Sequence, residues 1–402
     1  MNLTLEYHRS PVRYLTGRAA TSTQVGGRAA GLLAANLSPL RLLSRPDPCR
    51  PGSDWTRVRP IRSGICGSDL GLLTGRNSPY LSAVVSMPFT PGHEVVGQTL
   101  DDLPAGDGRP ELPRGTRVVL DPVLGCAARG IDLCPGCATA DRNRCDRITA
   151  GAVSAGLQTG FCADTGGGWS RMLVAHRSQL HPVPDSLDDH AAVLVEPLAC
   201  AIRAVRRVPI PPGARVLVVG AGTVGLLTLL ALREHSKAGP VYAVARYAHQ
   251  RERAEALGAT DVLSPDRVAR ALRRATGGFL ATPDRGAEYL LGGVDVVFEC
   301  TGGSGLDTAL RVARAGGTVV LSGMPNRGAD LTPAWFRELE LVGAYASGQG
   351  DFPAALALAH AAPLASYVDA VYPLSRWRDA IGHAHAAGRL GTVKVAFDPT
   401  RE

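Results

Sequence analysis

Lysine, aromatic residues and long apolar runs are all scarce in this 402-residue chain, and each scarcity excludes something. Lys237 and Lys394 are the only lysines, so the net charge of +7 comes almost wholly from arginine. The arginines are scattered and aromatic residues make up only 5% of the chain, which argues against a nucleic-acid-binding surface. No uninterrupted apolar run reaches the roughly 18 residues of a membrane-spanning helix. We therefore expect a globular protein without a nucleic-acid or membrane partner.

Cysteine is present in a pattern that favours metal binding. Nine cysteines are spread over the chain, but four of them fall between residues 126 and 145. Such crowding is typical of a metal site in a reducing compartment, so we expect a cytoplasmic protein. The first 45 residues are arginine-rich with one acid, Glu6, as in a mitochondrial transit peptide. Because Leu3 to Tyr7 alternates like a strand, we interpret this segment as a structured extension.

The pattern of apolar residues predicts an α/β protein with two domains. Short apolar strands broken by Gly and Pro run from about residue 54 to 190, which indicates a turn-rich β domain. After Pro197 strands and helices alternate, which predicts a doubly wound parallel sheet. We assign 1–197 and 345–402 to the first domain, with 1–52 as an extension, and 198–344 to the second.

More detailed expectations concern single elements. In the second domain we expect strands at 215–219, 241–245, 295–298 and 317–322 and helices at 223–235, 249–257 and 305–315. Helices are also expected at 198–207, 352–361 and 375–388. Residues 264–293 are expected to be irregular. A single helix is expected between 20 and 45, limited by Pro39.

Two short motifs combine the ligands of a catalytic metal. Cys66, Ser68 and Asp69 lie in Cys66-Gly67-Ser68-Asp69, and His93 and Glu94 follow Gly92. Catalytic zinc takes three protein ligands and leaves one position open. Cys66 and His93 supply two, while Glu94 and Glu196 compete for the third.

The neighbours of these ligands have expected roles of their own. Asp69 should accept a hydrogen bond from the far side of the His93 ring. Ser68 should relay the proton of an alcohol whose oxygen is made more acidic by the metal.

A glycine-rich turn predicts a dinucleotide site. The turn contains Gly220, Gly222, Thr223, Val224 and Gly225, and it follows the apolar run 216–219. Glycines at these places permit a tight turn, close approach of the pyrophosphate, and close helix packing. The phosphates would face the helix N-terminus, where unpaired N–H groups favour negative charge.

The end of the next strand bears on the choice of cofactor. The carboxylate that receives the ribose of NAD is expected about twenty residues past the last glycine, where Ala245 stands. Arg246 follows and can pair with a 2′-phosphate, so NADP is favoured over NAD. His249 and Arg251 are weaker candidates, and Arg251 is interpreted as part of a solvated helix start.

The cysteine cluster predicts a second, structural metal. Cys126, Cys134, Cys137 and Cys145 lie in a loop-like stretch rich in Gly and Pro. Four thiolates around one zinc make a closed structural site. The alternatives are buried free cysteines or a redox pair formed by Cys134 and Cys137.

Taken together, these residues resemble the medium-chain dehydrogenase/reductase superfamily, in its zinc-dependent alcohol, polyol and threonine dehydrogenase branch. The resemblance covers about residues 53 to 400. It rests on the glycine turn and on Gly64-Ile65-Cys66-Gly67-Ser68-Asp69, Pro91-Gly92-His93-Glu94, Glu196-Pro197-Leu198 and Phe298-Glu299-Cys300-Thr301-Gly302.

The family implies a GroES-like catalytic domain, a Rossmann domain, and a homodimer or homotetramer. It also implies that Thr301 and Gly302, with Ser322 and Gly323, line the nicotinamide side. The Glu196-Pro197 pair makes the chain more similar to the polyol and sugar dehydrogenases than to the alcohol dehydrogenases proper. The expected activity is hydride transfer between NADP, or NAD, and a secondary alcohol, polyol or sugar-like small molecule. The alternatives are a zinc-free quinone or enoyl reductase and a non-catalytic NADPH sensor.

Three departures from the family pattern stand out. Seven residues separate Cys126 from Cys134 where relatives usually have two, so Cys126 either reaches the metal by a longer loop or does not bind it. Gly71 stands where relatives often carry a histidine of the proton relay. The segment before Asp54 is longer than usual.

Overall fold

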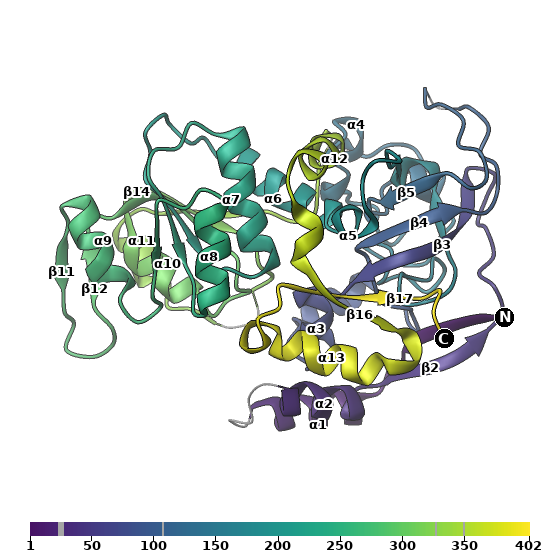
Figure 1. Cartoon of the computed structure of the whole chain (residues 1–402), viewed down its shortest axis with the longest axis horizontal. Helices are drawn as coiled ribbons and strands as arrows, with labels where there is room; N and C mark the ends of the chain where they lie inside the picture. The colour runs from purple at the N-terminus through teal and green to yellow at the C-terminus, as the bar shows by residue number, and fades with distance from the viewer. Residues whose placement is uncertain (23–27, 107, 326–327, 349) are drawn as a thin grey trace. The chain divides into compact units, whose positions relative to one another are not determined.

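The computed structural model describes residues 1–402 except 23–27, 107, 326–327 and 349 (Figure 1). The chain forms two compact units. The first contains Met1–Glu196 and Ser347–Glu402, and the second contains Pro197–Ala346. Among the described residues no helix combines the length and the apolar character needed to cross a membrane.

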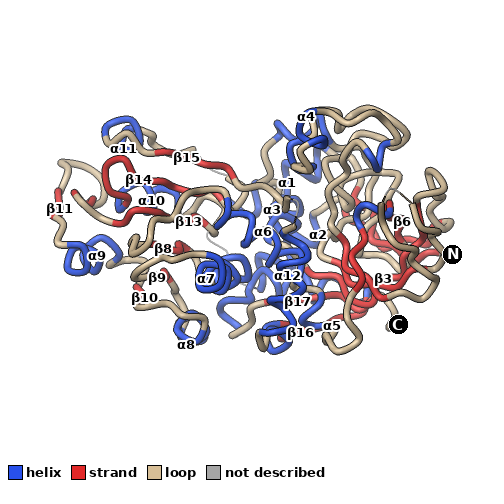
Figure 2. Tube along the Cα trace, turned by 90° about the horizontal axis from the view of Figure 1, so that it is seen from above, coloured by secondary structure: helices blue, strands red, loops and turns tan. Residues whose placement is uncertain are grey.

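The first unit is built on a mostly antiparallel sheet. β3 (Trp55–Gly64) is a central strand, and its first half pairs with β6. Figure 2 shows the strands of this unit in red. Apolar side chains of neighbouring strands, such as Val58, Val95 and Val118, form a buried core. The sheet order is β16 (Val368–Pro373), β17 (Lys394–Asp398), β3, β4 (Val95–Thr99), β5 (Arg117–Leu120) and β7 (Leu180–Pro182), with β6 (Leu173–His176) beside β3.

The N-terminal segment is an ordered part of this unit. β1 (Asn2–Tyr7) pairs antiparallel with β2 (Leu40–Arg45), and α1 (Pro11–Ser22) and α2 (Arg28–Leu37) lie between them in sequence. The helix expected between 20 and 45, limited by Pro39, is present as α2, whereas α1 was not expected. Pro39 does end the helical stretch, but the residues after it continue as a strand because Leu40 is buried with Leu5 and Tyr7.

The N-terminal helices pack against the C-terminal part of the chain. α2 lies along α13 (Trp377–Ala386). A Cβ on Gly31 would lie 2.6 Å from Cβ of His385, so only glycine permits this approach. Trp169 and Phe89 are buried in the same unit, whereas Tyr80 is 85% exposed.

The second unit contains a six-stranded parallel sheet, as the strand–helix alternation predicts. Its order is β10 (Asp261–Leu263), β9 (Val241–Val244), β8 (Val216–Val219), β13 (Val294–Glu299), β14 (Ala313–Leu321) and β15 (Glu340–Gly343). All four residues of β8 are buried, as expected for a strand covered on both faces. In Figure 1 α10 (Leu306–Val312) lies on one side of the strands, and α7 (Thr223–His235) and α8 (Ala248–Ala256) on the other.

The segment 264–293 is not irregular as expected. It forms α9 (Val268–Thr276) and a hairpin of β11 (Phe279–Ala281) and β12 (Tyr289–Leu291). Val268 and Leu272 are buried in the core of the second unit while Arg270, Arg273 and Arg274 are exposed, so the helix is amphipathic. Gly277, with a φ of 67°, ends it.

The expected helix at 305–315 ends earlier, because β14 begins at Ala313. The remaining helices are α3 (Gly67–Leu73), α4 (Pro135–Ala138), α5 (Asp189–Ala192), α6 (Val195–Arg206), α11 (Thr332–Phe336) and α12 (Asp351–Ala361).

Candidate zinc and dinucleotide sites

Cys66 and His93 come together in the first unit at the ends of two elements. Cys66 stands directly before α3, and its backbone N–H donates to Oδ2 of Asp69 at 2.9 Å, which caps the first turn of the helix. His93 directly precedes Glu94 and β4. Cys66 lies beside the His93 ring, and both Cys66 and the Glu196 carboxylate act electrostatically on that ring. Among the described residues these three groups are not gathered as closely as the four clustered cysteines.

The His93 ring lies between an acid and the thiol. Nδ1 of His93 is 3.6 Å from Oδ1 of the fully buried Asp69. Burial opposes a positive charge on His93, but Asp69, then Cys66 and then Glu196 outweigh it and raise its pKa well above the ordinary value. The pKa of Asp69 is also raised, because the effect of burial on this carboxyl exceeds the lowering effect of His93. Nδ1 of His93 and Oδ1 of Asp69 are too far apart for a hydrogen bond, and neither has a hydrogen-bond partner among the described residues, so the expected hydrogen bond from His93 to Asp69 is not formed. The ring nevertheless lies between a carboxylate and a thiol, an arrangement that fits a metal-binding histidine.

Glu94, the adjacent carboxylate, is ion-paired with Lys394. Both side chains are almost completely buried. Burial opposes the charge on Lys394, but Glu94 and then Cys66 raise its pKa above the ordinary value. A Cβ on Gly64 would lie 1.9 Å from Oε2 of Glu94, so glycine is required for the carboxylate to occupy this place. Lys394 was not predicted from the sequence to take part in this site. Its position inside the apolar run from Val393 to Phe397 could have indicated a buried lysine that needs an acidic partner.

The four clustered cysteines meet, and they fit one zinc ion. Their sulfur atoms all lie within 4.8 Å of one another, including that of Cys126 despite its unusual spacing. The backbone N–H groups of Cys126 and Cys134 each donate to a sulfur of the cluster at 3.4 Å. Donors of this kind stabilise thiolates, which are the form that binds zinc.

A buried arginine organises the loop around this cluster. Arg129 is fully buried and donates to backbone carbonyls of Leu124, Val153 and Gly156, at 3.2, 3.0 and 2.6 Å. These carbonyls belong to segments without regular secondary structure, so the guanidinium provides hydrogen bonds that a sheet or helix would otherwise supply.

The glycine turn of the second unit has the shape needed to bind phosphate. A Cβ on Gly225 would lie 1.7 Å from the carbonyl oxygen of Gly220, so this turn cannot close with any other residue there. Gly220 has a φ of 100°, which favours glycine. No described atom lies within 4 Å of a Cβ placed on Gly222, directly before Thr223 and Val224 at the start of α7. Open space at the N-terminus of a 13-residue helix fits a pyrophosphate.

The residues expected on the nicotinamide side are organised by Glu299, which the sequence analysis did not assign. Glu299 is buried at the end of β13, and its carboxylate accepts hydrogen bonds from the backbone N–H of Thr301 and Gly303, at 2.8 and 3.2 Å. Its carbonyl accepts from the N–H groups of Ser322 and Gly323, at 3.0 and 2.9 Å. Glu299 thereby links the loop of Thr301 and Gly302 to the end of β14. The sequence signal that could have indicated this role is a carboxylate at the end of an apolar strand.

Two arginines follow β9 and differ in their surroundings. Arg246 is exposed directly beyond the strand. Arg251 is not part of a solvated helix start as expected, because its guanidinium donates to the carbonyls of Ala245 and Val262, at 3.4 and 2.5 Å. It therefore links the ends of β9 and β10. The Tyr247 and His249 rings stack nearby, with centroids 5.9 Å apart.

Comparison with known proteins agrees with these two sites. Residues 52–185 match the model of the alcohol dehydrogenase GroES-like domain, and residues 223–361 match that of the zinc-binding dehydrogenase. The chain is 32% identical over 285 residues to (R,R)-butanediol dehydrogenase of Bacillus subtilis, covering 67% of this chain and 70% of that one. This chain belongs to the zinc-dependent alcohol dehydrogenases of the medium-chain dehydrogenase/reductase superfamily.

Other members of the family show similar relationships. A probable zinc-binding alcohol dehydrogenase of Mycobacterium tuberculosis is 31% identical over 289 residues, which are 71% of this chain and 65% of that protein. A zinc-binding dehydrogenase from Sinorhizobium meliloti, solved bound to NADP, is 29% identical with a TM-score of 0.68, covering 90% of this chain and 95% of that one. The GroES-like fold, the Rossmann fold and the activity of an alcohol oxidoreductase are confirmed.

Proposed function

We propose that this enzyme oxidises a secondary alcohol of the polyol or sugar type, or reduces the corresponding ketone, with NADP as the preferred cofactor. The main support is the position of Cys66 beside the His93 ring in the first unit, with the Glu196 carboxylate acting electrostatically on the same ring. The name of the butanediol dehydrogenase relative, whose substrate carries neighbouring hydroxyl groups, supports a polyol.

Cys66, His93 and Glu196 are the proposed ligands of the catalytic zinc. Glu196 is preferred over Glu94 because Lys394 already neutralises Glu94 in a buried ion pair. Removing Glu94 from that pair would leave a lysine charge buried without a partner, which is costly. Glu196 lies in the first turn of α6 and acts on His93.

The remaining residues of the site have proposed roles in moving the proton. Zinc would supply Lewis-acid activation of the substrate hydroxyl, and the nicotinamide would supply the hydride acceptor. Ser68 would accept the hydroxyl proton, because it lies two residues after Cys66 in the first turn of α3. Asp69 would keep the His93 ring oriented from behind.

Arg246 is the proposed partner of the NADP 2′-phosphate. It lies just beyond the end of β9. The preceding residue is Ala245, which has no carboxylate to repel the phosphate. The Sinorhizobium relative, solved bound to NADP, supports the same choice.

We further propose a cytoplasmic homodimer, with a homotetramer as the larger alternative. β15 is an edge strand, paired with β14 alone among the described strands of its sheet. Trp335, at 81% exposed, and Phe336, at 60%, precede it in α11. Exposed edges with apolar neighbours are places where a second copy can pair about a two-fold axis. The gathered thiols of the cysteine cluster suit a reducing compartment.

The test is a Cys66→Ser variant, compared with a Cys49→Ser control that removes an exposed cysteine outside the site. Oxidation of 2,3-butanediol and a panel of polyols is measured with NADP and with NAD. We expect the Cys66 variant to lose at least about 1000-fold in kcat/KM while its NADPH affinity changes less than twofold, because the dinucleotide turn lies in the other unit.

The control should match the unaltered enzyme, whose activity should be higher with NADP than with NAD. Full activity of the Cys66 variant would refute the ligand assignment. A preference for NAD would refute the role of Arg246. Absence of turnover on every alcohol would favour the sensor alternative.

A further inference from the structure

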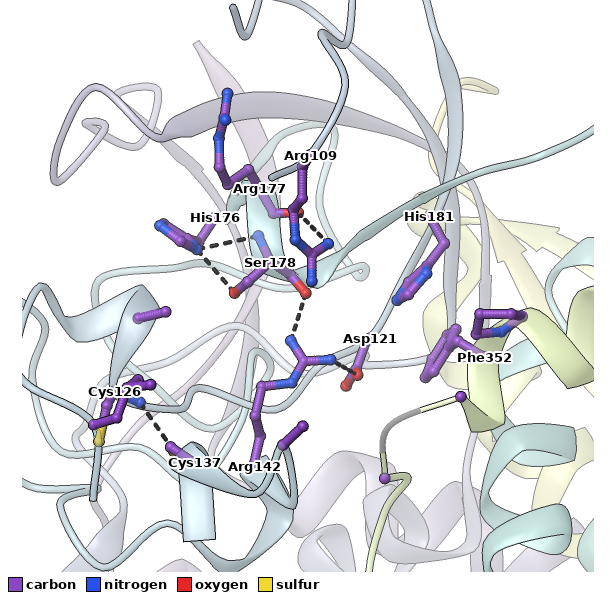
Figure 3. Close-up of a pocket in the computed structure, with 16 residues that line it drawn as sticks. Arg109, Asp121, Cys126, Cys137, Arg142, His176, Arg177, Ser178, His181 and Phe352 are labelled. Carbon is purple, nitrogen blue, oxygen red and sulfur yellow. Dashed lines mark hydrogen bonds and ion pairs between the residues drawn. The ribbon is translucent and has the colours of Figure 1, made fainter. Parts of the chain in front are cut away.

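A cavity of about 490 Å³ lies in the first unit, between the cysteine-rich loop and the start of α12. None of Cys66, His93 and Glu196 lines it. Its size falls within the range of small-ligand pockets, about 300 to 1,000 Å³. Figure 3 shows Arg109, Arg142 and His181 converging on it from three separate segments.

A buried carboxylate and three guanidinium groups line the cavity. Nη2 of Arg142 is 2.6 Å from Oδ2 of Asp121, and Arg142 also donates to the carbonyl of Ser178. Arg109 donates to the carbonyl of Arg177 at 3.3 Å and acts electrostatically on Asp121. Arg177 is paired with Asp54 at 3.0 Å. With that pair neutral, the two remaining arginines, Arg109 and Arg142, outnumber the single aspartate, Asp121, among the charged side chains that line the cavity.

His181 contributes a polar atom for which the fold supplies no partner. Its ring stacks on Phe352, with centroids 4.8 Å apart and planes 11° from parallel. Nε2 is buried and has no hydrogen-bond partner among the described residues. Burial, then Arg142 and Arg109, lowers the pKa of His181 to about 3, so the ring is neutral at pH 7. A neutral imidazole can donate one hydrogen bond from Nε2.

We propose that this cavity is a second ligand site, which binds the carboxylate of a small organic anion between Arg109, Arg142 and the Nε2 of His181. Arginine pairs with a carboxylate through two parallel hydrogen bonds. A carboxylate brings one negative charge, which the arginine in excess of Asp121 can pair, whereas a phosphate dianion would bring a second negative charge beside Asp121. The apolar side chains of Leu133 and Phe352, which also line the cavity, would contact the body of the ligand.

Binding there would also affect the structural metal loop. Cys126 and Cys137 belong to the lining, and Arg142 lies only three residues before Cys145. A ligand that holds Arg142 in place would therefore stabilise the loop that carries the four sulfurs. Because none of the proposed zinc ligands Cys66, His93 and Glu196 lines the cavity, binding there would not depend on the proposed hydride-transfer site.

The test uses the zinc-loaded full-length enzyme with benzoate as the probe and benzamide as its neutral counterpart. Calorimetric titration and thermal unfolding are measured for the unaltered chain and for Arg109→Gln, His181→Phe and Arg114→Gln. Arg114 is exposed and outside the lining, so its variant is the control. His181→Phe keeps an aromatic ring that can stack on Phe352 and removes both ring nitrogens. We expect benzoate to bind and to raise the unfolding temperature, and benzamide to do neither.

Benzoate affinity should fall at least about tenfold in Arg109→Gln and about fivefold in His181→Phe, and stay unchanged in Arg114→Gln. The same titration in the Cys66→Ser background separates this site from the proposed catalytic zinc: persistence of binding supports the cavity. Loss of binding in that background, equal binding of benzamide, or unchanged affinity in both cavity variants would overturn the proposal. Zinc analysis of each variant identifies any loss caused by an emptied cysteine cluster.

Discussion

At the scale of single residues, Lys394 shows how one side chain determines what its neighbour can do. Glu94 follows His93 directly and on sequence grounds competes with Glu196 for the metal. The buried lysine on β17 pairs with Glu94, which satisfies its charge without a metal. Removing either charge of a buried ion pair is destabilising, because water cannot reach the remaining charge to take the place of its partner.

Replacing Lys394 with Met should therefore lower the free energy of unfolding by about 3 to 5 kcal/mol, because Glu94 keeps a buried charge without its partner. The double variant Lys394→Met/Glu94→Gln should recover most of that loss. Urea unfolding of the two variants and the unaltered chain measures the difference. Equal stability of the single and double variants would contradict the importance of the pair.

His181 predicts a dependence of stability on pH. Its pKa is about 3 in the folded chain, because of burial and then of Arg142 and Arg109, and about 6.5 when unfolded. Between these values the unfolded chain binds a proton that the folded chain does not, so stability falls as pH decreases from 6.5 toward 3. The contribution of this group is roughly 1.4 kcal/mol per pH unit.

A His181→Phe variant should show a flatter acid limb, measured as unfolding free energy between pH 7 and pH 4. His190→Phe, which alters a histidine outside the cavity, is the matched control. An unchanged slope in His181→Phe would show that this ring is not the group responsible.

At the scale of elements, two glycines of the turn between β8 and α7 are needed for different reasons, one for the fold and one for the cofactor. Gly225 is required by the fold, because a Cβ there would collide with the carbonyl of Gly220. Gly222 faces open space, so the fold does not require glycine there. The approach of a pyrophosphate would require it.

The two glycines should consequently respond differently to substitution by alanine. Gly225→Ala should lower stability by at least about 2 kcal/mol, since backbone must shift to admit the methyl group. Gly222→Ala should keep its stability within about 0.5 kcal/mol and lose NADPH affinity. Thermal unfolding and fluorescence titration with NADPH separate the outcomes. Equal effects of both substitutions on stability would contradict the distinction.

At the scale of the whole molecule, the metal cluster supports a part of the first unit that has little regular structure. The segment from Cys126 to Cys145 contains one four-residue helix, α4, and short turns. Its apolar core consists largely of the cysteines themselves, with Ile131 and Ile148. Zinc must therefore replace the stabilisation that an apolar core would provide.

Removing zinc with a strong chelator should lower the unfolding temperature and make the segment near Cys134 sensitive to protease. Cys134→Ser should reproduce the effect without a chelator, and Cys162→Ser, which alters a buried cysteine outside the cluster, should not. Mass spectrometry of limited digests locates the cleavage. Protection of the segment after complete loss of zinc would contradict a structural role for the metal.

The sequence by itself determined the features in which neighbouring residues act together. The glycine turn and the alternation of strands and helices depend on local geometry, so the parallel sheet was predicted and confirmed. Segment 264–293 was the exception, because its flanking glycines and its many arginines obscured an amphipathic helix.

Only the tertiary structure decided what depends on residues far apart in the chain. The ion pair of Glu94 with Lys394, the gathering of Cys126 with its three partners, and the meeting of Arg109, Arg142 and His181 at one cavity are of this kind. Sequence patterns carry the periodicity of an element. They do not carry the register in which distant elements pack, which sets the neighbours of a buried charge.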